Sequence, residues 1–179
     1  MKILSFDQGS SISGWAILED GVLIASGIID LHKEKVIETR IQHMAYELKK
    51  IILEAHPDRI AFEDIALQDS AKVVIWLGRL QGYMQMLCWE YQIPFSIYLP
   101  TSWRKTIGIS PVKLNEDGKK VRKKRKELKA DACQVVFDKY GISVSDDIAD
   151  AILIGLCDYI KNNELKENED NGTDNECDN

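Results

Sequence analysis

The sequence lacks any hydrophobic run long enough to cross a membrane, and its first residues do not form a signal-peptide pattern. Apolar residues make up 45% and charged residues 29% of its 179 positions, which is typical of a globular protein with one ordinary core. We therefore expect a single-domain cytoplasmic protein that does not contact a membrane.

The chain also lacks cysteine and histidine residues at the spacing that binds zinc. Its four cysteines form no CxxC pair, and its three histidines have no partners at ligand spacing. Cys88, Cys133 and Cys157 lie in apolar helical patterns, so we expect buried free thiols. Any metal site would have to use oxygen ligands.

Charge is distributed unevenly along the chain, although the net charge is only -6. Residues 113–129 contain nine Lys or Arg and three acids, whereas residues 161–179 contain two Lys and seven acids. The first segment indicates an electropositive face suited to an anionic partner. The second has few hydrophobic residues, and we expect an acidic, disordered tail after a folded domain at 1–160.

The first half of the chain reads as a mixed sheet with crossover helices. Strands are predicted at 3–7, 14–20 and 22–30, joined by tight turns that include the Asp20-Gly21 hairpin signal. A helix at 34–55, ended by Pro57, leads to a strand at 59–63 that we expect to run parallel to the first. A long apolar helix at 70–91 and a fifth strand at 93–99 follow.

The second half is predicted to be helical. We expect a short helix capped by Thr101 and ending before Gly108, a loop at 110–118, and a helix at 119–139 whose first half is basic. Gly141 would end that helix. The last helix would begin after a cap at Ser145 and end near residue 160.

Four acids stand where packing alone does not explain them. Asp7 and Glu63 end two strands expected to be parallel neighbours, so their side chains would emerge at one edge of the sheet. Asp147 and Asp150 are three residues apart and share one face of the last helix. Asp146 is an alternative to Asp147, because capping explains either one equally well.

A cluster of four carboxylates is unstable until cations neutralise it. With no His or Cys in the set, the site suits Mg²⁺ or Mn²⁺, and two such ions can promote phosphodiester hydrolysis. The sequence therefore predicts a two-metal nuclease site.

Five stretches resemble the RuvC-type Holliday-junction resolvases, in the divergent form carried by bacteriophages. They are FDQGSSISGWAI, IAFEDI, DSAKVVIWLGRLQG, LPTSWRKTIG and DDIADAILIG, and the match runs from residue 3 to about residue 160. The resemblance implies an α/β, ribonuclease-H-like fold with a five-stranded mixed sheet flanked by helices. It also implies an endodeoxyribonuclease that resolves four-way junctions during phage recombination, within the cytoplasm of a bacterial host.

Carried over residue by residue, the resemblance assigns the metal and catalytic positions to Asp7, Glu63, Asp147 and Asp150. It places Arg104 and Lys129 near the scissile phosphate, and it implies a homodimer formed through the helix at 70–91. With the basic segment added, the expected DNA-binding residues are Arg104, Lys105, Lys119, Lys120, Arg122, Lys123, Lys124, Arg125, Lys126 and Lys129.

The sequence departs from the family pattern in two places. Ala66 stands where cellular members carry a phenylalanine that unstacks bases, and the stretch 111–126 is longer and more basic. The residues alone also leave other functions open: a nuclease acting on RNA–DNA hybrids or on other branched DNA, and a junction-binding module without catalysis. An actin-like ATPase would need a second domain, for which the chain has no room.

Overall fold

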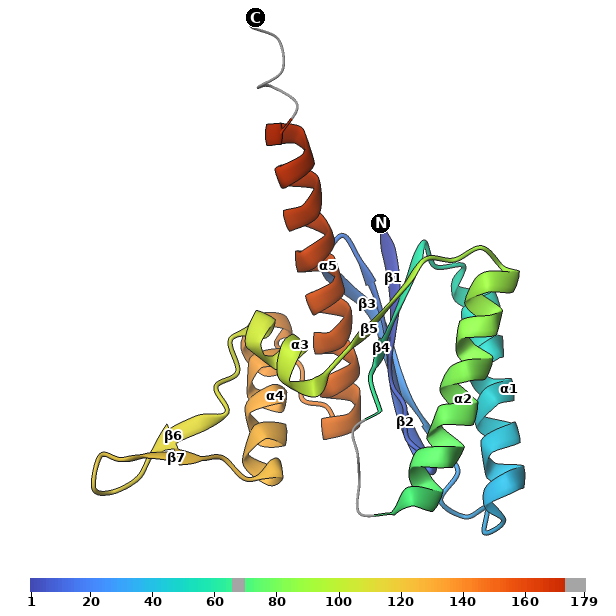
Figure 1. Ribbon diagram of the computed structural model, residues 1–179, viewed down its shortest axis with the longest axis horizontal. Helices are drawn as coiled ribbons and strands as arrows, with labels where there is room; N and C mark the ends of the chain where they lie inside the picture. The colour runs from blue at the N-terminus through green and yellow to red at the C-terminus, as the bar shows by residue number, and fades with distance from the viewer. Residues whose placement is uncertain (66–69, 173–179) are drawn as a thin grey trace, which may run out of the picture.

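A five-stranded sheet forms the centre of the protein (Figure 1). This computed structural model describes residues 1–65 and 70–172, with side chains through residue 165. Strands β1 (Lys2–Asp7), β2 (Ile12–Glu19) and β3 (Val22–Asp30) form an antiparallel meander. Strands β4 (Arg59–Glu63) and β5 (Phe95–Tyr98) add in parallel to β1, so the order is β3-β2-β1-β4-β5. The predicted mixed sheet is confirmed.

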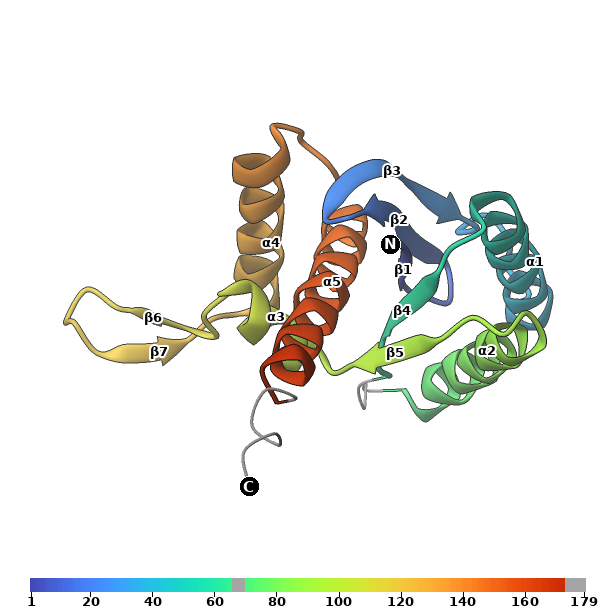
Figure 2. The same cartoon turned by 90° about the horizontal axis from the view of Figure 1, so that it is seen from above.

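Helices cover both faces of the sheet (Figure 2). Helices α1 (Ile37–Ala55) and α2 (Ala71–Glu90) pack on one face, and α5 (Asp146–Gly172) packs on the other. Helices α3 (Pro100–Ile107) and α4 (Arg125–Tyr140) lie beside α5, away from α1 and α2.

Alternation along the strands divides the core in two. Leu4 and Phe6 of β1 face α1 and α2, and Phe6 stacks on Phe62 of β4 with ring centroids 6.2 Å apart. Ile3 and Ser5 face α5, where the Ser5 hydroxyl donates a 2.7 Å hydrogen bond to the main-chain oxygen of Ala151. The small side chain of Ser5 lets α5 approach the sheet closely.

Two glycines make that approach possible. A Cβ on Gly14 would lie 2.0 Å from the main-chain oxygen of Asp147, and one on Gly155 would lie 2.6 Å from both Ser5 Oγ and Leu18 Cδ1. Gly14 is the cross-strand partner of Asp7. The first turn of α5 is therefore pressed against the end of β1.

The basic segment folds differently from the prediction. Instead of a loop followed by a helix from residue 119, β6 (Val112–Leu114) and β7 (Lys120–Arg122) form an antiparallel hairpin, and α4 begins at Arg125. The turn explains the difference, because the Asn115 side chain accepts a hydrogen bond from the Lys119 amide and Gly118 adopts a φ of 73°. This turn chemistry outweighs the helix propensity of the lysines.

Other helix ends also differ from expectation. Leu99, rather than Thr101, is the N-cap of α3, with Pro100 in the first helical position that proline favours. Gly141 ends α4 as predicted, with a left-handed φ of 70°. Helix α5 begins at Asp146, directly after Ser145, but it continues to Gly172, well beyond the expected end near residue 160.

The side chains at the start of that extension support it. Asn162 donates a 2.7 Å hydrogen bond to the Asp158 carbonyl, and Lys161 bonds Ser102 of α3. The disorder expected for 161–179 is therefore not found at 161–172. Ala66 and residues 173–179, with Cys177, lie outside the described residues.

Cysteine chemistry agrees with the sequence. Cys88 and Cys157 are buried and Cys133 is partly buried, and all three are free thiols. Among the described helices, none has the length and apolar character needed to cross a membrane.

The close packing at Gly14 leads to a stability prediction. Gly14→Ala should lower the free energy of unfolding by about 1–3 kcal/mol, because the added methyl meets a backbone oxygen that cannot rotate away. Gly155→Ala should cost less, because it meets side-chain atoms. Urea unfolding of both variants checks this, and an equal or smaller loss for Gly14→Ala would contradict the packing argument.

Candidate metal and nucleic-acid site

The four predicted acids meet at one edge of the sheet. Phe6 pairs with Phe62 in the parallel register of β1 and β4, so the next residues, Asp7 and Glu63, emerge side by side. Asp147 and Asp150 are in the first turns of α5, which the Gly14 contact holds against the end of β1. Residues far apart in sequence are thus brought into electrostatic contact.

The pKa values of the acids show how strongly they interact. Burial raises the pKa of Asp7 well above its usual range, and the charges of Glu63, Asp150 and Asp147 raise it further. Burial also raises the pKa of Asp150 to about 7, against the opposing effect of Arg104. The metal-free cluster therefore resists full ionisation at neutral pH.

Glu63 is held by several donors. Burial raises its pKa, while a hydrogen bond from Trp103 and the charges of Arg104 and Arg125 oppose that rise. The Trp103 Nε1–H donates to Glu63 Oε1 at 2.8 Å. The side-chain amides of Gln8 and Gln81 donate to the Glu63 carbonyl at 3.2 and 3.1 Å, which fixes the end of β4.

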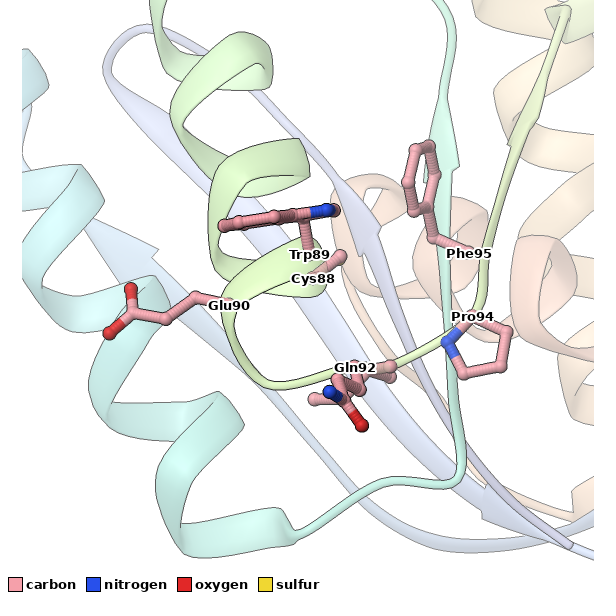
Figure 3. Close-up of a pocket in the computed structure, with 7 residues that line it drawn as sticks. Cys88, Trp89, Glu90, Gln92, Pro94 and Phe95 are labelled. Carbon is pink, nitrogen blue, oxygen red and sulfur yellow. The ribbon is translucent and has the colours of Figure 1, made fainter.

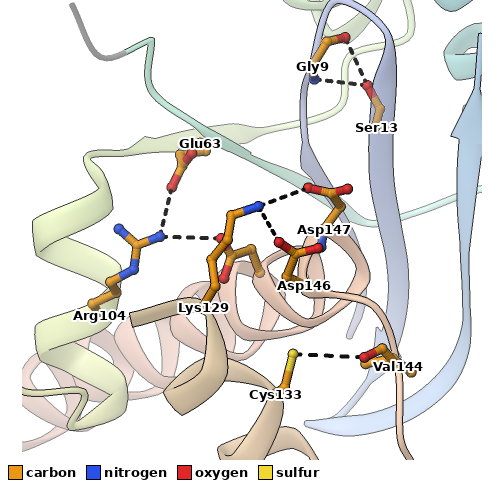
Figure 4. Close-up of polar contacts among 10 residues, drawn as sticks. Gly9, Ser13, Glu63, Arg104, Lys129, Cys133, Val144, Asp146 and Asp147 are labelled. Atoms are coloured by element: carbon orange, nitrogen blue, oxygen red, sulfur yellow. Dashed lines mark hydrogen bonds and ion pairs between the residues drawn. The ribbon is translucent and has the colours of Figure 1, made fainter. Parts of the chain in front are cut away.

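Two basic residues face the acids from α3 and α4 (Figure 4). Arg104 Nη2 is 3.3 Å from Asp150 Oδ2 and 3.9 Å from Glu63 Oε1. Lys129 Nζ is 2.5 Å from Asp146 Oδ2 and 3.3 Å from Asp147 Oδ1. Both were predicted from the sequence, and the structure places both beside the carboxylates.

The structure also bears on the choice between Asp146 and Asp147. The Lys129 hydrogen bond lowers the pKa of Asp146, which is the more exposed of the two. Asp147 is among the charges that raise the pKa of Asp7. The charge of Asp146 in turn raises the pKa of Asp150, so both residues act on the cluster, and Asp147 is the one whose charge acts on Asp7.

Trp103 was missed by the sequence analysis. Its side chain is completely buried, its N–H reaches Glu63, and its ring lies under the Arg104 guanidinium, 4.4 Å from the ring centroid. A buried tryptophan needs a partner for its N–H, and Trp103 follows the fifth strand at the edge where the acids lie. A tryptophan that follows a strand ending at the acid edge could therefore have been predicted from the sequence as a hydrogen-bond partner of one of the acids.

The remaining predicted DNA-binding residues form a basic surface over α3, the β6–β7 hairpin and the start of α4. Lys123 bonds Asp131 at 2.7 Å, and the charge of Arg125 reaches Glu63. The other members are exposed on α3, around the hairpin or in the first turn of α4: Lys105, Lys119, Lys120, Arg122, Lys124 and Lys126.

The chemistry of the acid cluster fits hard divalent cations. In the described part of the chain, no three Asp, Glu, His or Cys side chains are already grouped as a metal site, and Arg104 and Lys129 form ion pairs with several of the carboxylates. Among those same residues, the buried Asp150 Oδ1 has no hydrogen-bond partner. An unpaired carboxylate oxygen within an all-oxygen donor set is what a hard cation requires.

These pKa shifts predict how stability changes with pH when EDTA removes metal. The folded-state pKa of Asp150, about 7, is above the unfolded value of about 3.9, so its stabilising effect is lost as pH rises between them. Asp150→Asn should therefore gain stability relative to the parent chain from pH 5 to pH 8, by at most about 1.4 kcal/mol per pH unit. Thermal or urea unfolding measures this.

Glu127→Gln is the matched control. Because hydrogen bonds from Lys113 and from the Lys124 amide lower the pKa of Glu127, that carboxyl is ionised in both states over nearly all of this range, and its variant should differ from the parent by about the same amount at pH 5 and pH 8. A pH-independent difference for Asp150→Asn would contradict the assigned pKa.

Comparison with known proteins identifies the fold and the family. The family model described as crossover junction endodeoxyribonuclease RuvC matches residues 3–158. The RuvC of Thermosipho melanesiensis is 28% identical over 162 residues, covering 88% of this chain and 96% of its own, and that of Halorhodospira halophila is 24% identical over 164 residues, covering 87% and 88%.

Solved structures agree on the fold. Thermus thermophilus RuvC in complex with a Holliday junction substrate superposes with a TM-score of 0.68 at 13% identity, covering 90% of this chain and 96% of that one. The yeast mitochondrial Holliday junction resolvase Ydc2 gives 0.57 at 14% identity, covering 92% and 80%. The predicted ribonuclease-H-like fold is confirmed, and with the family match over nearly the whole folded chain it shows that this protein belongs to the RuvC family of crossover junction endodeoxyribonucleases.

Proposed function

We propose that this protein resolves four-way DNA junctions by nicking two opposed strands, with divalent cations held by Asp7, Glu63, Asp147 and Asp150. The observation that carries the proposal is the convergence of these acids on one buried site in a chain of the RuvC family. A role in bacteriophage recombination is part of the same proposal, and it rests on the sequence resemblance alone.

We infer that Mg²⁺ or Mn²⁺ is the cation and that each site holds two. When bound, two such ions supply charge neutralisation and an activated water for phosphodiester hydrolysis. The raised pKa values of Asp7 and Asp150 support this, because a cluster that resists ionisation alone gains most from cations. Trp103 and the Gln8 and Gln81 amides would keep Glu63 oriented toward the site.

Arg104 and Lys129 would then serve the phosphate. Both approach the carboxylates from α3 and α4, the helices that also carry the exposed Lys105 and Lys126 of the basic surface. A phosphodiester that enters between the acids and this surface would meet two cationic side chains close to its oxygens. The exposed lysines would add affinity that does not depend on sequence.

A homodimer through α2 remains our proposal for the assembly. The outer face of α2 is lined mainly by small and apolar residues, Ile75, Gly78, Gly82, Tyr83, Met86 and Trp89, with the exposed Arg79 among them. Trp89 is 77% exposed, and a Cβ on either glycine would meet no atom within 4 Å among the described residues. Such an open apolar stripe suits close packing against a second copy.

A pocket extends this face toward β5 (Figure 3). It has a volume of about 660 Å³, and Trp89 and Phe95 lie on opposite walls. Phe95, Ile97 and Leu99 continue the exposed apolar surface along the sheet edge. A two-fold axis through this surface would match the symmetry of the junction and present two sites to opposed strands.

The acid cluster predicts the effect of Asp7→Asn on cleavage. Removing the central carboxylate should lower the rate of nicking by about a hundredfold or more, on the order of 3 kcal/mol in barrier, while junction binding persists. Nicks should be mapped on all four arms of a mobile junction in Mg²⁺ and in Mn²⁺, beside flap, RNA–DNA hybrid and linear duplex.

Asp138→Asn is the control, because it makes the same charge change on the exposed surface of α4, where Asp138 bonds Gln134. It should cleave at the parental rate. Normal nicking by Asp7→Asn would remove the proposed mechanism, and preferred cleavage of the hybrid would reassign the substrate.

The exposed stripe predicts how the dimer can be broken. Trp89→Glu should raise the dimer dissociation constant by about thirtyfold or more, because it places a charge in the apolar contact. Phe137→Glu, an exposed aromatic of α4 on the opposite face of the sheet, should leave the dimer intact. Sedimentation velocity measures both, and a parental mass for Trp89→Glu would place the interface elsewhere.

A further inference from the structure

The β6–β7 hairpin extends away from the body of the protein as a two-stranded ribbon (Figures 1 and 2). Its base is tied to α4 and to the chain before it. Lys113 forms an ion pair with Glu127, and the Lys123 amide donates a hydrogen bond to the Pro111 carbonyl. The ribbon therefore has a defined orientation relative to α4, the helix that carries Lys129 into the acid site.

The strand register separates the ribbon into two faces. Lys113 pairs with Val121, and the ion pair of Lys113 with Glu127 directs this face toward α4. The opposite face consists of two cross-strand pairs, Val112 with Arg122 and Leu114 with Lys120. We call these four residues the outer face of the ribbon.

The outer face combines exposed apolar and cationic side chains. Leu114 is 65% exposed and Val112 is 38% exposed, and each is directly opposite a basic residue. Lys120 and Arg122 suit a phosphate backbone, but they do not explain two apolar side chains in water. Both apolar residues lie on β6 and both basic residues on β7, so a partner that offers apolar surface beside a row of phosphates accounts for all four.

A DNA groove is such a partner. The major groove admits a two-stranded ribbon, and its floor presents base edges, including thymine methyl groups, between the phosphate rows. A protein surface would supply apolar contacts but not the regularly spaced anions that the two basic side chains match. The charges therefore favour DNA over a second polypeptide.

We propose that the outer face of the ribbon enters the groove of a duplex arm of the substrate, with Leu114 and Val112 against base edges and Lys120 and Arg122 on the flanking phosphates. This inference rests on the proposed function, because it takes DNA as the substrate. It adds a contact outside the acid site, which would hold one arm while the strand near Asp7 is cut.

The test compares neighbouring residues on the two faces, with binding measured by fluorescence anisotropy in EDTA. Leu114→Gln should weaken binding to a four-way junction by about five- to tenfold without changing its salt dependence, because the lost contact is apolar. Arg122→Gln should weaken binding and reduce the slope of log affinity against log salt by about one. Lys113→Gln, with the same charge change on the inner face, should stay within about twofold of the parent.

Leu114→Met separates a lost contact from a damaged hairpin. It keeps the apolar volume and should bind as the parent does. Equal losses for Lys113→Gln and Arg122→Gln with none for Leu114→Gln would overturn the groove contact in favour of diffuse electrostatics. A changed oligomeric mass for Leu114→Gln with unchanged DNA affinity would overturn it in favour of a protein contact.

Failure of the proposed function can be distinguished from failure of the ribbon contact. Cleavage of the junction by the parent chain in Mg²⁺ or Mn²⁺ tests the former alone. The same variants are measured on a linear duplex of one arm's length, where the groove contact should persist. If Leu114→Gln and Lys113→Gln bind each of the two DNAs with equal affinity, the proposal is wrong.

Discussion

The contact between Gly14 and the first turn of α5 is the constraint on which the site depends. It lets the backbone of Asp147 approach the cross-strand neighbour of Asp7, where any side chain would overlap the Asp147 carbonyl. Packing on both faces of the sheet drives this approach, and the acids oppose it, because like charges in a poorly solvated space repel. The fold thus holds together a group of side chains that would separate if they were free.

The surroundings of the acids offset that repulsion unevenly. Arg104 and Lys129 engage the carboxylates of α5, while the buried Trp103 supports Glu63 and stacks under Arg104. Burial and the charges of Glu63, Asp150 and Asp147 raise the pKa of Asp7 well above its usual range, although the charge of Lys129 opposes the rise. This distribution is consistent with a site whose central carboxylate is completed by a cation rather than by the protein.

Two surfaces outside the acid cluster lie on opposite sides of the sheet. The apolar face of α2 lies on one side of the sheet, whereas the basic surface and the ribbon lie beyond α5 on the other. In the proposed function, the first surface would form the dimer and the second would bind nucleic acid. Helix α2 packs directly on the sheet that carries Asp7 and Glu63, whereas the basic surface is carried by α3, α4 and the hairpin, and α3 and α4 pack on α5.

The sequence by itself determined the strands, the parallel pairing of β1 with β4, and the four acids, because these follow from short-range patterns and from the cost of burying an unpaired carboxylate. The prediction was wrong for residues 110–124, where the Asn115–Gly118 turn outweighs the helix propensity of a lysine-rich run, and for the end of α5. Only the tertiary structure showed that the charge of Asp147 acts on Asp7, that Trp103 donates a hydrogen bond to Glu63, and that Leu114 and Arg122 share a face. These facts depend on the rotation of helices and on strand register. Both are set by contacts between distant segments, so no periodic pattern in the sequence predicts them.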